Sequence, residues 1–172
     1  MIYSLDDPRL LHMAEARRQG PRVQTQHATL YIIIQRPAPS SRYLWSFSIF
    51  DDVSGTWRTF GAQTVNPGEP CKLKARNGDP GQDGMGYIPL SRILSEWVPE
   101  VYERCRLIGV SEEIDEVESS QRYVRDLCSH LLEEGIIEDF EFESVFSKLD
   151  RFDCPAESNY EEPPNPWART TR

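Results

Sequence analysis

Three short, mostly apolar segments joined by turns are the feature that most limits how this chain can fold. They span residues 28–36, 43–51 and 56–60, and turns rich in Pro, Ser, Asp and Gly separate them. The first segment is apolar at nearly every position, which is typical of a strand in the middle of a sheet. The second alternates between a face of large apolar side chains and a more polar face. Because the connections are short, the three segments are predicted to form an antiparallel meander.

A helical periodicity follows later in the chain. Apolar side chains from Val124 to Leu132 recur at the spacing i, i+3, i+4, i+7 and i+8, which places them on one face of a helix. Gly135 follows as the expected C-terminal residue. We therefore expect a long helix from Ser119 or Ser120 to about residue 134, with one of these serines as its N-cap.

Other segments give weaker patterns. Residues 71–76 alternate and are predicted to form an edge strand, whose lysines would discourage edge-to-edge pairing. Residues 89–97 are predicted to form a short helix closed by Pro99, residues 104–110 a strand, and residues 140–149 a last helix. Together these elements predict an α+β fold, in which an antiparallel sheet of four to five strands packs against the long helix of the C-terminal half.

The chain of 172 residues has the usual length of one domain with a single core. Residues 1–22 are predicted to form an N-terminal helix or arm, which begins at an Asp-Asp-Pro sequence typical of a helix start. Residues 23–153 are predicted to form a single α+β domain. Residues 154–172 are acidic and rich in proline, so we expect them to be disordered.

Charge is distributed unevenly along the sequence. The net charge is −9, and residues 111–172 hold 17 acidic against 6 basic side chains, whereas residues 1–110 hold 11 acidic against 13 basic ones. Nucleic-acid binding needs a basic footprint, so we expect no nucleic-acid partner. The acidic part is either a solvated helical surface with a tail or a docking surface for a basic partner.

Membrane, metal and phosphate-loop signals are missing from the sequence. No segment has the ~20 apolar residues of a membrane span, and the start has no secretory signal, so a cytoplasmic protein without a membrane partner is expected. No glycine-rich phosphate loop is present, and no cofactor is expected. The cysteines are widely spaced and are predicted to be free thiols rather than metal ligands: Cys71, Cys105, Cys128 and Cys154.

Several short motifs resemble those of a known protein group. They are Leu44-Trp45 in the second predicted strand, Trp57 in the third, and the sequences RCRLIGV and SSQRYVRDLCSHLLEEGII later in the chain. Together, over roughly residues 28–138, they resemble an uncharacterised group of small intracellular fungal proteins, which are similar to circularly permuted NlpC/P60-type (papain-like) domains. The resemblance implies a papain-like arrangement of the sheet and the helix.

The resemblance also implies that the catalytic groups have been replaced. In that group the strand carries His-Trp and the helix begins with Cys-Gln. Here Leu44 stands at the His position and Ser120 at the Cys position, followed by the matching Gln121. A serine nucleophile needs a general base within hydrogen-bond reach, and leucine cannot act as one. Leu44 and Ser120 are therefore expected to be vestigial positions of a degenerate site, with no catalytic residue.

A residual nucleophile is the least favoured hypothesis. Ser120 or Cys128 could act with His27, which lies just before the first predicted strand. The simpler interpretation is that His27 is a surface residue and that Cys128 packs in the core as a small apolar side chain.

Aromatic and arginine side chains suggest a different kind of site. A pocket lined by aromatic rings, with Arg42 or Arg58 as a charged anchor, would suit a small apolar ligand. The alternative is that these rings form core or cross-strand contacts. The predicted ligand-binding residues are Tyr43, Trp45, Trp57, Arg58, Tyr87 and Trp97.

The sequence therefore favours a non-catalytic binding or interaction protein on a degenerate papain-like scaffold, with a small apolar ligand or a protein as its partner. The alternative is a cofactor-independent cyclase or isomerase of fungal secondary metabolism, which would use the aromatic and arginine pocket. A residual hydrolase or transferase is the third possibility.

Overall fold

The computed structural model describes residues 25–36, 42–81 and 85–152 of the chain. The predictions for the N-terminal helix or arm, residues 1–22, and for the acidic tail, residues 154–172, lie outside these described residues.

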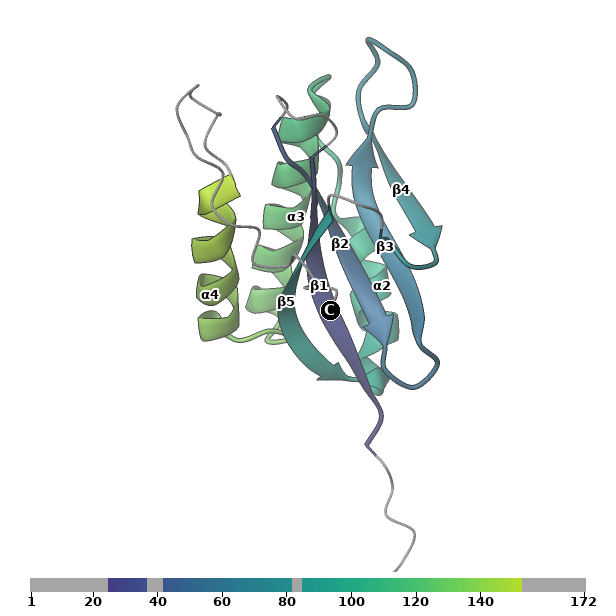
Figure 1. Ribbon diagram of the computed structural model, residues 1–172, viewed down its shortest axis with the longest axis vertical. Helices are drawn as coiled ribbons and strands as arrows, with labels where there is room; N and C mark the ends of the chain where they lie inside the picture. The colour runs from purple at the N-terminus through teal and green to yellow at the C-terminus, as the bar shows by residue number, and fades with distance from the viewer. Residues whose placement is uncertain (1–24, 37–41, 82–84, 153–172) are drawn as a thin grey trace, which may run out of the picture.

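The described residues form an α+β fold with a five-stranded sheet (Figure 1). The strand order is β4-β3-β2-β1-β5, and every neighbouring pair is antiparallel. This confirms the predicted meander and places its first strand, β1, inside the sheet, between β2 and β5. The strands are β1 (His27–Gln35), β2 (Leu44–Asp51), β3 (Thr56–Gln63), β4 (Lys72–Asn77) and β5 (Met85–Leu94).

The β2–β3 hairpin illustrates how local sequence sets the turn. Gly55 has a φ of 67°, a backbone conformation that side-chain-bearing residues rarely adopt. The Asp51 carboxylate accepts hydrogen bonds from the Ser54 hydroxyl at 2.8 Å and from the Val53 N–H at 2.9 Å. These two hydrogen bonds hold the pKa of Asp51 below its usual value. Asp51 therefore serves the turn, as an Asx-type turn residue does.

The predicted helix over residues 89–97 is wrong. Its first part belongs to β5, which pairs with the second edge of β1, and only Ser95–Trp97 form a short 3-10 turn, η1. Pro89 lies opposite Tyr31, where the β1–β5 register shifts. Proline lacks an N–H donor and is tolerated at such an irregularity. The proline was therefore compatible with a strand, and long-range pairing with β1 decided the outcome.

The predicted strand over residues 104–110 is also wrong. Residues 104–107 of that segment are the end of helix α2 (Val98–Leu107), which has Pro99 in its first turn, and residues 108–110 follow the helix. Proline suits the first turn of a helix because its missing N–H has no partner there in any case. Pro99 therefore starts a helix instead of closing one.

The other two helices are α3 (Glu116–Glu133) and α4 (Asp139–Leu149), so the last predicted helix is confirmed. Helix α3 begins about one turn earlier than expected. Its N-cap is Asp115, whose carboxylate accepts hydrogen bonds from the N–H groups of Val117 and Glu118. The prediction that Ser119 or Ser120 caps the helix is therefore wrong, because both serines lie inside it.

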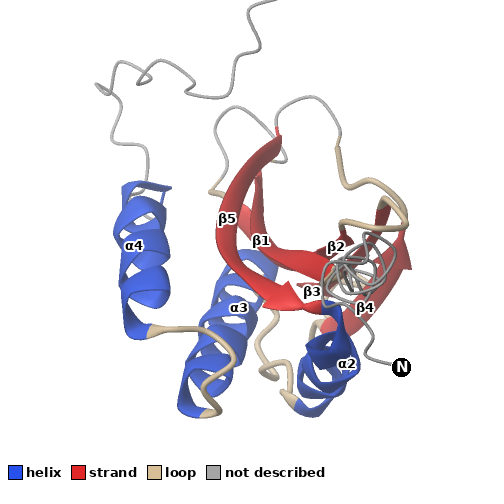
Figure 2. Cartoon of the chain, turned by 90° about the horizontal axis from the view of Figure 1, so that it is seen from below, coloured by secondary structure: helices blue, strands red, loops and turns tan. Residues whose placement is uncertain are grey.

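All three helices lie on one side of the sheet (Figure 2). We call this side the covered face and the opposite side the outer face. Helix α3 packs against β2 and β3, and α4 packs against β5 and α3. The buried side chains of β1 and β2 on the covered face are Ala28, Leu30, Ile32, Ile34, Trp45, Phe47 and Ile49. They pack with the apolar face of α3, which was predicted from its periodicity.

Within the described residues, none of the helices combines the length and the apolar character that crossing a membrane requires.

Candidate functional site

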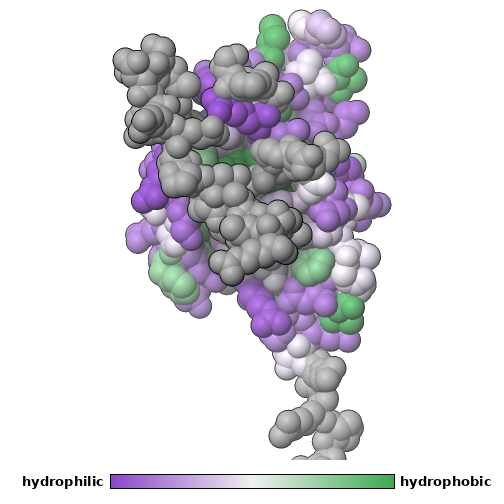
Figure 3. Space-filling model, in the orientation of Figure 1, coloured by the Kyte–Doolittle hydropathy of each residue, from purple (hydrophilic) through white to green (hydrophobic). Residues whose placement is uncertain are grey.

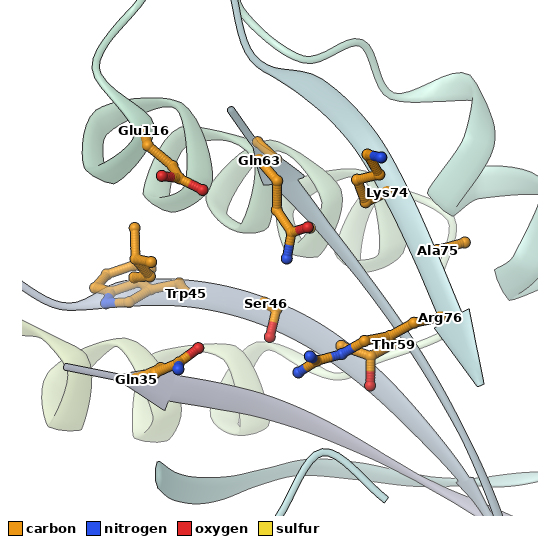
Figure 4. Close-up of a pocket in the computed structure, with 12 residues that line it drawn as sticks. Gln35, Trp45, Ser46, Thr59, Gln63, Lys74, Ala75, Arg76 and Glu116 are labelled. Atoms are coloured by element: carbon orange, nitrogen blue, oxygen red, sulfur yellow. The ribbon is translucent and has the colours of Figure 1, made fainter. Parts of the chain in front are cut away.

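A groove crosses the outer face of the sheet near the start of β2 (Figure 4). Its volume is about 130 Å³. Small side chains form its floor, since Ser46 of β2, Gly61 of β3 and Thr59 of β3 lie between larger neighbours. Longer polar side chains surround the floor: Gln35, Gln63, Lys74, Arg76 and Glu116.

Gly61 is the residue that makes the groove possible. A Cβ atom built on Gly61 would lie 3.1 Å from the Cβ of Ser46, which is tighter than ordinary side-chain contact. A larger residue at this position would therefore press on β2 and fill the floor. Because strand side chains alternate, Ser46 and Leu44 point to the outer face while Trp45 points to the covered face.

Cationic side chains border the groove on its β4 side. Lys72, Lys74 and Arg76 occupy alternate positions of β4, and all three are exposed. In the part of the chain that the structure describes, none of the three forms an ion pair. The Arg76 guanidinium points across the sheet toward Ser46 and Thr59 (Figure 4). Positive charge therefore gathers beside hydroxyl groups, which suits an anionic or hydrogen-bonding partner.

The other end of the groove is negative. Glu116, in the first turn of α3, accepts a hydrogen bond from the Thr64 N–H at 3.2 Å. This carboxylate would repel an anion at its own end of the groove. An anionic group is therefore best accommodated next to Lys74 and Arg76.

A buried polar pair lies beside the groove. The hydroxyl groups of Ser48 and Thr59 are 2.6 Å apart, and both side chains are buried. Each hydroxyl satisfies the other, so the pair does not carry the penalty of an unpaired buried polar group.

An aromatic cluster occupies the far end of the outer face. The Trp57 ring lies 4.7 Å from Phe50, 5.2 Å from Tyr31 and 5.7 Å from Tyr87, measured between ring centroids. The Tyr87 hydroxyl donates a hydrogen bond to Asp79 at 3.2 Å. These rings pack side by side along adjacent strands, which is the cross-strand arrangement that was the alternative to a ligand pocket.

Of the predicted ligand-binding residues, the structure brings together only Trp57 and Tyr87. Trp45 is buried on the covered face, where the Arg125 guanidinium lies 4.9 Å from its ring, and it also contributes to the lining of the groove. Arg58 also points to the covered face and lies 4.9 Å from the Tyr102 ring. A single pocket that contains both Trp45 and Trp57 is therefore not formed.

The remaining two predicted ligand-binding residues are elsewhere. The Tyr43 ring packs against Phe152 at 5.2 Å. Trp97 is exposed on η1, outside the aromatic cluster. Their role in ligand binding stays a prediction, without a shared cavity to support it.

Ser120 and its neighbour Gln121 hold the beginning of β2. The Ser120 hydroxyl donates a hydrogen bond to the Val117 carbonyl at 2.9 Å and accepts one from the backbone N–H of Trp45 at 3.2 Å. The Gln121 amide donates to the Tyr43 carbonyl at 3.0 Å. Pairing between β2 and β3 begins only at Phe47, so α3 supplies these backbone partners. Ser120 therefore has a structural role in this position.

The two positions that the resemblance singled out, 44 and 120, are brought near each other in space, since the neighbour of Leu44, Trp45, donates its backbone N–H to Ser120, but they lie on different sides of the sheet. Leu44 points to the outer face and lines the groove. Ser120 lies on α3, beneath the covered face, and is buried. A side chain at position 44 therefore points away from Ser120.

The cysteines of the helical layer are poorly suited to nucleophilic chemistry. Burial raises the pKa of the Cys105 thiol to about 12, and it also raises the pKa of Cys128 well above the usual range. His27 lies at the start of β1 opposite Leu94, and His130 lies near Glu133 and Glu134 on α3. Among the described residues, neither histidine forms a hydrogen bond with a serine or a cysteine.

Sequence reasoning did not identify the groove. Gln35, Ser46 and Gly61 come from three strands, and each looks ordinary in its own segment. Two of its lining residues, Leu44 and Trp45, were singled out from the sequence for other reasons. The alternation of Lys72, Lys74 and Arg76 was a further signal, but it was interpreted only as protection of an edge strand. The residues of the floor become neighbours only through the strand register.

Comparison of the chain with models of known families, with curated proteins and with solved structures found no match. The function of the groove is therefore inferred from the residues that form it.

Proposed function

We propose that this chain is a non-catalytic binding protein, which engages a protein partner through the groove on the outer face of its sheet. The observation that carries the proposal is the groove itself. It combines small floor residues, hydrogen-bonding side chains and the exposed charges of Lys74 and Arg76, which form no ion pair with any residue that the structure describes. Polar groups without internal partners, gathered around a hollow, are typical of a surface that binds something else. The degenerate papain-like origin of the scaffold is part of the proposal.

The state of the candidate nucleophiles supports a binding role. The Ser120 hydroxyl is buried and already makes two hydrogen bonds to backbone groups. Cys128 is completely buried, so its thiol favours the neutral form and cannot meet a substrate. Neither group faces the groove, which lies on the other side of the sheet.

The size and the lining of the groove favour a protein segment over a small apolar ligand. A volume of about 130 Å³ is below the ~300 Å³ at which drug-sized ligand pockets begin. Glutamine, lysine and arginine side chains line it, so an apolar ligand would leave these groups without partners. A side chain or short stretch of a larger partner suits both the size and the polarity.

The test is a selection of displayed random dodecamer peptides against the full chain, followed by affinity measurements on three proteins. Ser46→Tyr fills the floor of the groove with a residue that suits a strand. Ser147→Tyr, on the exposed side of α4, is the matched control. We expect selected peptides to bind the unmodified chain and Ser147→Tyr equally, and Ser46→Tyr at least tenfold more weakly.

Thermal unfolding of Ser46→Tyr shows whether that variant is folded. If it is not, the double variant Gln35→Ala/Gln63→Ala replaces it, since this variant only shortens two side chains at the rim. Selection of no peptide would overturn the proposal, and so would peptides that bind the groove variants as well as the unmodified chain.

A further inference from the structure

Strand β4 presents a free edge next to the groove. Within the described ranges it is the last strand in the order of the sheet, and its one strand partner there is β3, which it pairs with over all six residues Lys72–Asn77. The residue just before β4, Cys71, donates its backbone N–H to the Glu113 carbonyl at 3.3 Å. This contact does not extend into β4 itself. Among the described residues, no other strand follows on the outer side of β4. Its outward backbone groups are therefore available for pairing.

The side chains of β4 give this edge two distinct sides. Lys72, Lys74 and Arg76 point to the outer face, whereas Leu73 and Ala75 point to the covered face. Side chains at alternate positions of a strand are about 6.6–6.8 Å apart along it. In a neighbouring strand, residues that point to the same face have the same spacing. A strand beside β4 with acidic residues at every second position would place each carboxylate opposite a cation.

We propose that the partner of this protein is an extended acidic segment, which adds to β4 as a sixth strand. Its acidic side chains alternate and lie on the outer face beside Lys72, Lys74 and Arg76, the cations that border the groove. Its other side carries small or apolar residues next to Leu73 and Ala75. The inference rests on the proposed function, because it names the partner that the outer-face groove receives.

Charge decides between this partner and a second copy of the chain. Two β4 strands side by side would bring their lysines and arginines close together, and like charges directly opposite are destabilising. The same three cations attract an acidic strand. Opposite-charge cross-strand pairs contribute only about 0.2–1 kcal/mol each. They therefore favour an acidic strand over a basic one but supply little of the total affinity. Main-chain hydrogen bonds along the edge supply most of the remaining affinity.

The experiment uses nine-residue fluorescent peptides and fluorescence anisotropy with the full chain. The first peptide alternates Glu and Thr. The second has the same composition with its glutamates in one block, and the third alternates Lys and Thr. A fourth repeats the first with N-methyl groups at alternate residues, and a fifth shifts those groups by one residue. Only one of the two methylated peptides loses the N–H groups that face β4, because strand N–H groups alternate in direction.

We expect the alternating Glu–Thr peptide to bind best, the blocked peptide at least tenfold more weakly, and the Lys–Thr peptide not at all. One methylated peptide should lose binding and the other should keep it. Binding should weaken severalfold between 50 and 300 mM salt, because salt screens exposed charges. Lys74→Glu should weaken binding about tenfold, whereas Lys148→Glu, the same change on the exposed side of α4, should have no effect.

Equal binding of the alternating and the blocked peptides would overturn the inference, as would equal binding of both methylated peptides. Sedimentation measures whether the chain forms dimers. If it does, and if Lys74→Glu changes the extent of dimerisation, a second copy of the chain occupies the edge instead. If the displayed peptides still depend on position 46 while the Glu–Thr peptide does not bind, only the strand addition fails. The proposed function fails if no displayed peptide is selected, or if the displayed peptides are also insensitive to the groove variants.

Discussion

The two faces of the sheet are built from the same strands and differ most in character near the start of β2. On β2, Trp45, Phe47 and Ile49 are buried against the helices, whereas Ser46 on the opposite face lies in a polar groove. Figure 3, which views the outer face, shows mostly hydrophilic side chains along the side of the molecule formed by β3 and β4. The covered face therefore supplies most of the stability, and this leaves the outer face free to carry polar and charged groups.

The largest expected effect concerns the covered face. Phe47→Ala removes a completely buried ring from the middle of the sheet and should lower the free energy of unfolding by about 3–5 kcal/mol. Its neighbour Ser46 points to the outer face, and its hydroxyl makes no hydrogen bond among the described residues, so Ser46→Ala should change stability by less than about 0.5 kcal/mol. Urea denaturation measures both. Similar losses in the two variants would break the comparison between the faces.

The next effect concerns the contact between α3 and the start of β2. Ser120→Ala leaves the buried Trp45 N–H without its acceptor, which should cost about 1–3 kcal/mol of the free energy of unfolding. Ser129, on the same helix, makes no side-chain hydrogen bond among the described residues, and Ser129→Ala is the control. A Ser120→Ala protein as stable as the control would show that this hydrogen bond is not needed.

Alkaline pH should weaken the helical layer. Burial holds the pKa of Cys105 at about 12 in the folded chain, against a usual value of 9.0, and the pKa of Cys128 is raised in the same direction. The folded state thus binds these protons more tightly than the unfolded state. The resulting stability is complete below about pH 9 and is lost as the pH rises toward 12. Denaturant unfolding between pH 8 and 11 measures the decline.

The cysteine variant sharpens this prediction. Cys128→Ala removes one of the two thiols, so the decline above pH 9 should be shallower than in the unmodified chain. If the free energy of unfolding declines with pH as steeply in the variant as in the unmodified chain, folding does not raise the pKa of Cys128.

The smallest effect tests whether positions 44 and 120 can cooperate across the sheet. In the double variant Leu44→His/Ser120→Cys, the imidazole points to the outer face and the new thiol lies under the covered face. The rate of iodoacetamide alkylation at position 120, followed by peptide mass spectrometry, should equal that of Ser120→Cys alone. A much faster reaction in the double variant would show that the histidine activates the thiol, and the separation of the two faces would be wrong.

The elements with strong periodicity were predictable from the sequence. The meander and the last helix are present, because alternation and helical spacing each specify a face that has to be buried. The segments that contain proline were not predictable in this way. Pro89 and Pro99 were interpreted as helix boundaries, whereas one lies in a strand and the other begins a helix. Proline restricts its own φ angle in a way that suits a strand irregularity, a helix start or a turn, so the neighbouring elements decide.

The candidate site was less predictable than the fold. Trp45 and Trp57 both looked suited to a ligand pocket, and the hairpin register places them on opposite faces. Gly61 had no local feature that marked it as part of a groove, because its importance comes from the contact with Ser46 on the neighbouring strand.

The sequence by itself determined the three strands of the meander and the helices α3 and α4, since hydrophobic periodicity and turn residues act over a few neighbouring positions. It also determined the alternation of cations along β4. Only the tertiary structure decided that β5 pairs with β1, that Ser120 serves the backbone of β2, and that Ser46, Gly61 and Arg76 surround one hollow. These outcomes depend on contacts between residues far apart in the chain, and strand register and helix packing set such contacts only when the whole core forms.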